Sequence, residues 1–242
     1  MARASNHRNP RPAVLFGLLL AALIGSAACL AIVHLRMERT DSREFSFLRW
    51  NLVLAWFPVA IAVVLSLAER WRAPLPLLAI LAAGWIAFLP NAPYLASDLV
   101  HLGTTWVNVP IWFDAAMFGT FAVTGLLLGY VSVFLVHSMV ARRLGQATAW
   151  GVTLATWALS SGGIYLGRVL RYNSWDAFIR PRAVVTDFLE PLQHPASEPS
   201  AALLLTTMAA CLIAGYLFFF AAVTSSRFPV PRGSTHGGAN RR

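Results

Sequence analysis

Long runs of apolar residues dominate this chain and limit what it can fold into. Six such blocks, separated by polar or arginine-bearing segments, match or approach the roughly 20 residues that a helix needs to cross a bilayer. The blocks are 13–35, 50–68, 75–89, 111–137, 147–167 and 201–223. Only 12% of the residues are charged, against roughly 25% in soluble domains. The pattern predicts an all-α, polytopic integral membrane helical bundle with about six transmembrane helices.

The basic residues indicate how the chain is oriented. All 19 are arginines, and they lie in the loops and tails. That distribution is typical of topology signals and lipid headgroup contacts, so we expect membrane lipids as partners and no nucleic acid. The loop 90–110 has no basic residue, which favours the extracytoplasmic side. We therefore predict a single transmembrane domain over 13–223, flanked by cytoplasmic tails at 1–12 and 224–242, the second of them disordered.

The third block is shorter than the others. Its 15 residues make a helix of about 22 Å, against roughly 30 Å of hydrocarbon. Pro90 and Pro93 then interrupt the helix, because proline lacks an amide donor and clashes with the preceding turn. From Asn91 a short amphipathic helix is expected at the extracytoplasmic interface, with its polar face turned toward the protein. The apolar face would carry Leu95, Leu99 and Leu102, and the polar face Tyr94, Asp98, His101 and Thr105.

A second interfacial helix is predicted within the loop 168–200. Its apolar residues recur at helical spacing, which is the pattern of a helix lying at a membrane surface. They are Val184, Val185, Phe188, Leu189 and Leu192. One further pattern concerns packing: Gly163 and Gly167 form a Gly-x-x-x-Gly motif in an apolar block, which predicts close approach of another helix.

Under this topology several polar residues from different blocks fall on the extracytoplasmic side, where we expect them to meet. The predicted polar cluster comprises Asn51, Asn91, Tyr94, Asn173 and Asp176. Three further residues, Asp98, His101 and Asp114, are the candidates for catalysis. Charged groups are costly within a membrane unless they are paired or useful, so their gathering marks a candidate site.

Asp98 and His101 are spaced i, i+3 and leave three interpretations open. They could form a hydrogen-bonded pair that fixes the loop, act as general acid and base, or share a metal ion. A metal would need a third ligand such as Asp114. The hydrogen-bonded pair is the simplest of the three interpretations because it needs no further residue. We expect neither a metal nor a cofactor.

Arg168 and Arg171 are the candidate phosphate-binding residues. On a continuous helix they would lie on one face, and arginine forks bind phosphate oxygens in a bidentate manner. The ligand would then be a lipid phosphate or a polyprenyl phosphate. The alternative is an ion pair with Asp98, Asp114 or Asp176, or general headgroup anchoring.

Four strings resemble a family of predicted bacterial multi-pass membrane proteins catalogued as domain of unknown function 1361. They are "RWNLVLAWFP", "FLPNAPYLASDLVHL", "FDAAMF" and "GIYLGRVLRYNSWD", and they fall within 50–176. The sequence departs from the family pattern at Val169, where an aromatic residue is common, and at Tyr172, where tryptophan is common. The resemblance implies that these strings are shared features of the family and implies no activity. We expect the protein in a bacterial inner (plasma) membrane.

Three functions fit these observations. The first is a non-catalytic protein that assists membrane assembly or binds a lipid or peptide. The second is an enzyme acting on a phospholipid or polyprenyl-phosphate substrate, with Asp98 or His101 as acid or base. The third is a small transporter in which Asp98, His101 and Asp114 relay protons. The third is disfavoured, because the first, second, fifth and sixth blocks carry no ionisable residue near mid-depth.

Overall fold

The computed structural model describes residues 12–102, 109–172, 176–194, 197 and 199–225, and within them every regular element is a helix. The elements are α1 (Pro12–Thr40), α2 (Phe47–Arg70), α3 (Leu75–Phe88), α4 (Asn91–Ser97), η1 (Asp98–His101), α5 (Ile111–Leu144), α6 (Gln146–Arg168), α7 (Asp176–Ile179), α8 (Pro181–Gln193) and α9 (Pro199–Ser225). The prediction of an all-α polytopic helical bundle is confirmed. The predicted tails lie outside the described residues, except for Pro12, Thr224 and Ser225.

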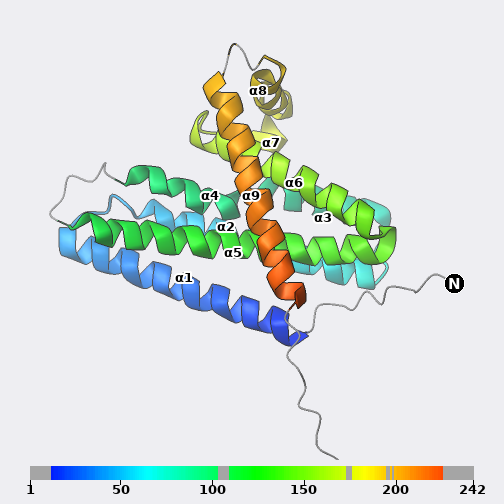
Figure 1. Ribbon diagram of the computed structural model, residues 1–242, viewed down its shortest axis with the longest axis horizontal. Helices are drawn as coiled ribbons and strands as arrows, with labels where there is room; N and C mark the ends of the chain where they lie inside the picture. Colours follow the sequence, from blue (N-terminus) through cyan, green and yellow to red (C-terminus); the bar gives the residue numbers. More distant parts are fainter. Residues whose placement is uncertain (1–11, 103–108, 173–175, 195–196, 198, 226–242) are drawn as a thin grey trace, which may run out of the picture.

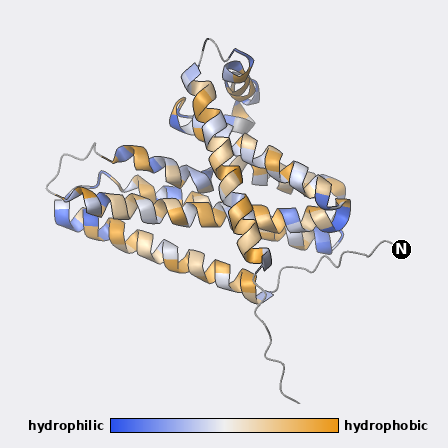
Figure 2. Ribbon diagram, in the orientation of Figure 1, coloured by the Kyte–Doolittle hydropathy of each residue, from blue (hydrophilic) through white to orange (hydrophobic). Residues whose placement is uncertain are grey.

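The central element is α5, which packs against α1, α2, α4 and α6. Figure 1 shows α1, α2 and α5 side by side along the long axis of the molecule. Apolar residues cover the middle of these helices and polar residues gather toward their ends (Figure 2), as expected of helices that cross hydrocarbon. The helices alternate in direction, so the end of α1, η1, the end of α6 and the start of α5 belong to one end of the bundle. We call this end the Asp98 end.

The opposite end, which we call the Glu69 end, contains a cluster of ion pairs. Glu69 near the end of α2 accepts a hydrogen bond from Arg143 of α5, and Arg142 lies 3.8 Å from the same carboxylate. Arg143 also donates to the Glu69 carbonyl at 3.1 Å. These contacts tie the ends of two neighbouring helices together.

The third segment is broken as predicted but is placed differently. α3 ends at Phe88, Leu89 and Pro90 form a turn, and α4 begins at Asn91. The Asn91 side-chain amide donates to the Phe88 carbonyl at 2.8 Å, which satisfies an acceptor at the break. The expected interfacial helix is corrected, because α4 packs against α2, α5 and α6. Together α3, α4 and η1 form one candidate membrane span, Leu75–His101.

The apolar face of α4 explains this placement. Leu95 is fully buried, and its side chain occupies the space left by Gly125 of α5, where a Cβ would lie 2.8 Å from the Leu95 Cβ. Asp98 is fully buried as well. α4 therefore meets protein on both faces and belongs inside the bundle, whereas Leu99 and Val100 of η1 are exposed.

Five helices in the described part of the chain are long and apolar enough to cross a membrane: Pro12–Thr40, Phe47–Arg70, Leu75–His101, Ile111–Leu144 and Pro199–Ser225. The predicted block 147–167 lies within α6, which is not among the five. Its hydropathy is lowered by buried Ser and Thr residues. Thr156 bonds to its own helix, at the Val152 carbonyl, at 2.7 Å, whereas the Thr153 hydroxyl lies 2.9 Å from a ring nitrogen of His137 in α5.

The C-terminal elements pack on α6. Figure 1 shows α9 crossing in front of the long helices, and its main contacts are with α6. The predicted helix at 184–192 is confirmed as α8, which packs on α6 and α9. Phe188 of α8 fills the space above Gly162, where any side chain would overlap its ring.

Candidate functional site

Asp98 lies at the centre of a polar cluster at the Asp98 end. Its side chain is 0% exposed, and Arg168, the last residue of α6, donates a hydrogen bond to one carboxylate oxygen. Asn51 of α2 donates to the other oxygen at 3.5 Å. Three elements therefore meet at one carboxylate, and the ion pair compensates for the cost of burying it.

Arg168 is engaged on every side of its guanidinium. Its Nη2 and Nε donate to Ser97 Oγ at 2.8 and 3.1 Å, and its Nη1 lies 3.2 Å from His101 Nε2. The Tyr94 ring packs under the guanidinium at 4.4 Å, a cation–π contact. Ser97 in turn donates to the Tyr94 carbonyl at 2.6 Å. We call Asn51, Tyr94, Ser97, Asp98, His101 and Arg168 the Arg168 cluster.

This geometry refines the interpretations of Asp98 and His101. The two side chains meet through Arg168, which bonds to both of them. Among the residues that the structure describes, no group of three or more His, Cys, Asp or Glu residues is arranged to hold a metal ion. The contacts hold η1 against the end of α6 and match the predicted role of fixing this segment. A role in proton transfer stays a prediction.

Asp114 lies in a separate ion pair and not with Asp98. Arg36 of α1 donates from Nε to Asp114 Oδ1 at 2.7 Å and from Nη2 to Oδ2 at 3.5 Å. Both side chains are 1% exposed. The predicted meeting of Asp114 with the other candidates is therefore corrected, because α5 turns this carboxylate toward α1.

Aromatic rings separate the two ion pairs. Arg36 packs over the Phe45 ring at 5.1 Å, and Phe45 contacts Phe118 edge to face at 5.2 Å. Phe118 lies 6.1 Å from the His101 ring, which also contacts Phe47 at 5.7 Å. The Asp98 end is therefore filled by two neutralised charge pairs with an apolar layer between them.

Arg168 and Arg171 are not on one helical face, contrary to the prediction. α6 ends at Arg168, and Arg171 adopts a left-handed backbone conformation with φ of 60°. The chain folds back over the helix end, where the Tyr172 amide donates to the Leu166 carbonyl at 3.0 Å. As a result Arg168 points into the cluster while Arg171 is exposed.

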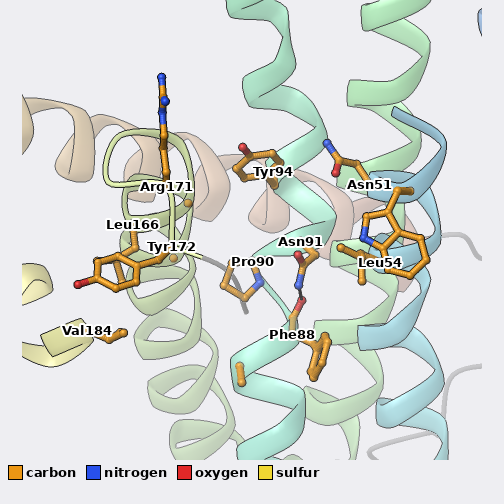
Figure 3. Close-up of a pocket in the computed structure, with 14 residues that line it drawn as sticks. Asn51, Leu54, Phe88, Pro90, Asn91, Tyr94, Leu166, Arg171, Tyr172 and Val184 are labelled. Atoms are coloured by element: carbon orange, nitrogen blue, oxygen red, sulfur yellow. Dashed lines mark hydrogen bonds between the residues drawn. The ribbon is translucent and has the colours of Figure 1, made fainter. Parts of the chain in front are cut away.

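A pocket of about 290 Å³ lies beside the cluster, with the Tyr94 ring in its wall (Figure 3). It is formed by α2, the break between α3 and α4, the end of α6, the turn after it and α8. We call it the Tyr94 pocket. Its lining residues are Trp50, Asn51, Leu54, Ala87, Phe88, Pro90, Asn91, Tyr94, Gly163, Leu166, Gly167, Arg171, Tyr172 and Val184. Predicted cluster residues Asn51, Asn91 and Tyr94 and the predicted arginine Arg171 thus share one cavity.

The predicted Gly-x-x-x-Gly contact shapes this pocket. A Cβ at Gly163 would overlap the Pro90 ring, and one at Gly167 would lie 3.2 Å from the Tyr94 ring. The missing side chains let α6 approach the α3–α4 break closely, as the motif predicts. That approach leaves the pocket between α6 and α2.

The turn after α6 is joined to α8 by a hydrogen bond. Tyr172 donates its hydroxyl to Asp187 Oδ2 at 2.8 Å. This bond to a carboxylate raises the pKa of the Tyr172 phenol above its ordinary value, because it stabilises the protonated form. Of the two remaining predicted residues, Asp176 begins α7 and Asn173 lies outside the described residues.

Sequence reasoning missed two members of this end of the molecule. Ser97 precedes His101 by one helical turn, so the spacing that selected Tyr94 and His101 would also have found it. Arg36 follows the first apolar block directly and was interpreted as a loop charge. In the structure α1 continues to Thr40, which brings Arg36 inside the bundle.

The fold and the site define a multi-pass membrane protein with a polar cluster and a pocket at one end. A family model described as "Protein of unknown function (DUF1361)" matches residues 50–214, more than half of the chain. The chain belongs to this family, which confirms the resemblance predicted from its motifs. No curated protein and no solved structure matches it.

Proposed function

We propose that this protein is non-catalytic and holds a membrane lipid in the Tyr94 pocket. The observation that carries the proposal is the composition of the pocket wall. Leu54, Phe88 and Leu166 supply apolar surface, whereas Asn51 and Arg171 supply polar groups. A volume of about 290 Å³ is close to the lower limit of ligand sites, so it suits part of one lipid.

The state of Asp98 and His101 supports binding over catalysis. An acid or base must reach the proton that it transfers, within hydrogen-bond distance or through one water. Asp98 is fully buried and neither residue lines the pocket. Both are already bonded to Arg168. The enzyme alternative would require this cluster to open.

Sidedness and cellular location form part of the same proposal. We place the chain in a bacterial inner membrane with both termini in the cytoplasm and the Asp98 end outside. The absence of basic residues from 90–110 supports this orientation. A Ser46→Cys variant, at an exposed position of the Asp98 end, should react with an impermeant maleimide added to whole cells. Labelling only after the cells are opened would reverse the orientation.

Lipid binding is tested by filling the pocket. Ala87→Phe places a ring at a lining position, and Ala83→Phe is the matched control one turn earlier on the exposed side of α3. Native mass spectrometry of the full chain in mild detergent should detect bound lipid in the wild type and in Ala83→Phe. Ala87→Phe should lose it while unfolding at a similar temperature. Equal lipid retention by both variants would contradict the proposal.

A second measurement addresses the enzyme alternative. Asp98→Asn and His101→Gln variants that insert and fold normally would be compared with the wild type for turnover of a phospholipid and of a polyprenyl phosphate. We expect no turnover by any of the three proteins. Turnover by the wild type that both variants lose would establish catalysis instead.

A further inference from the structure

Arg171 differs from the two ion-paired arginines of the Asp98 end, Arg36 and Arg168, and is the arginine that lines the Tyr94 pocket. Arg36 is paired with Asp114 and Arg168 with Asp98, so their charges are neutralised inside the bundle. Arg39 packs over the Phe113 ring at 5.7 Å, away from the pocket. Arg171 is exposed, lines the Tyr94 pocket, and forms no ion pair with any residue that the structure describes.

The backbone holds this charge at the pocket rim. Arg171 has a φ of 60°, a conformation that residues other than Gly, Asn and Asp adopt rarely. The amide of the next residue is fixed by its bond to Leu166. Figure 3 shows the Arg171 side chain pointing away from Leu166 and Tyr172 and extending beyond the level of the Tyr94 ring. A group bound by this guanidinium would lie at the mouth.

The rest of the wall indicates what that group carries. No Asp or Glu is among the lining residues, so nothing in the wall neutralises Arg171. A guanidinium presents a planar fork of donors that matches phosphate oxygens. Away from Arg171, Leu54 and Phe88 offer apolar surface on either side of Asn91, which suits a hydrocarbon chain (Figure 3).

We infer that the ligand is a net-anionic phospholipid whose phosphate is bound by Arg171 while one chain enters the Tyr94 pocket. This inference rests on the lipid binding proposed above and adds the chemistry of the headgroup. It also assigns different roles to the two arginines predicted to bind phosphate: Arg171 contacts the ligand, whereas Arg168 holds the cluster behind Tyr94.

The test uses the full-length protein in mild detergent with defined lipids. The probes are dioleoylphosphatidylglycerol, which is anionic, dioleoylphosphatidylcholine, which has no net charge, and dioleoylglycerol, which lacks phosphate. Native mass spectrometry should show the wild type preferring the anionic lipid to dioleoylglycerol roughly tenfold or more, as expected for a charge-assisted hydrogen bond to the phosphate. The wild type should also prefer the anionic lipid to dioleoylphosphatidylcholine, because the choline ammonium group offsets the phosphate charge. Arg171→Gln should abolish that preference. Arg182→Gln, at an exposed position of α8 outside the pocket, is the matched control and should retain it.

The outcomes separate the two proposals. If Ala87→Phe lowers binding of all lipids but Arg171→Gln leaves the preference intact, the headgroup assignment is wrong and lipid binding stands. If Ala87→Phe changes nothing, the pocket is not the lipid site and both proposals fail. Inorganic phosphate at millimolar concentration should not displace the lipid. Displacement would identify the free anion as the occupant and overturn the lipid assignment.

Discussion

The Arg168 cluster and the Tyr94 pocket lie on either side of one tyrosine ring. The arginine of the cluster is bonded to protein side chains, whereas the arginine of the pocket is exposed. Arg168 donates to Ser97 and Asp98 and lies against Tyr94. Arg171, three residues later, is exposed at a pocket mouth. The difference arises because α6 ends between them. A short turn has divided a pair of similar residues into one that supports the fold and one that is available to a ligand.

The largest effect is expected from removing the carboxylate of the cluster. Asp98→Ala leaves the Arg168 charge without its ion-pair partner, and breaking a buried pair in this way costs about 3–5 kcal/mol. Thermal unfolding in detergent should show this loss of stability. The double variant Asp98→Leu with Arg168→Met removes both charges and should recover most of it. A loss below about 1 kcal/mol for Asp98→Ala would mean that the pair contributes little.

Substituting the two arginines identically compares the two regions directly. Arg168→Gln leaves the buried Asp98 carboxylate without its ion-pair partner and should lower the free energy of unfolding by an amount similar to that for Asp98→Ala, about 3–5 kcal/mol. Arg171→Gln should leave it within about 0.5 kcal/mol, as at other surface positions. Both values come from thermal unfolding of the purified proteins. Similar destabilisation by both variants would contradict the division of roles.

A smaller effect is expected from relaxing the backbone at the pocket mouth. Arg171→Gly places at φ 60° the residue that tolerates this conformation best. The free energy of unfolding should rise by up to about 1 kcal/mol, while the preference for anionic lipid is lost. A single variant would then be more stable than the wild type and yet bind anionic lipid less selectively. A drop in both would mean that the Arg171 side chain supports the fold.

The smallest effect concerns the bond between the turn and α8. Tyr172 should ionise at a higher pH than an ordinary tyrosine, because its hydroxyl donates to Asp187. Asp187→Asn removes the carboxylate and should lower the pKa of the phenol again. Ultraviolet difference titration of the wild type, Asp187→Asn and Tyr172→Phe isolates this group from the other tyrosines. An identical titration of the wild type and Asp187→Asn would show that the bond does not form in solution.

The sequence predicted the membrane class, the positions of the long helices and the close approach at Gly163, because these depend on local patterns. It could not predict which charges pair. Which arginine pairs with Asp98 or Asp114 depends on how each helix is rotated about its axis and on where each helix ends. An error of a few residues in a predicted helix end changes which side chains can meet. Extension of α1 beyond Leu35 brought Arg36 to Asp114, and no pattern around that block signalled it.

The break after α6 was also beyond sequence reasoning. A helix that ends with a left-handed residue usually has glycine there, and Arg171 gives no such signal. The amphipathic pattern of α4 correctly predicts an apolar face and a polar face. It does not indicate that the apolar face is also covered by protein. Leu95 packs against α5 at Gly125, which has no side chain to block it. Gly125 is distant from Leu95 in the sequence, so no local pattern indicated this contact.

The separation between ion-pair partners along the chain has a consequence for biosynthesis. Arg168 follows Asp98 by 70 residues, and Asp114 follows Arg36 by 78. At about 5–20 residues per second, a ribosome needs several seconds or more to supply each missing partner. Until α6 has been synthesised, the Asp98 carboxylate therefore lacks the arginine that compensates for its burial in the folded protein. The contacts of η1 at the Asp98 end are therefore complete only after α6 has been synthesised, which makes α6 the element that supplies the last partner of the Arg168 cluster.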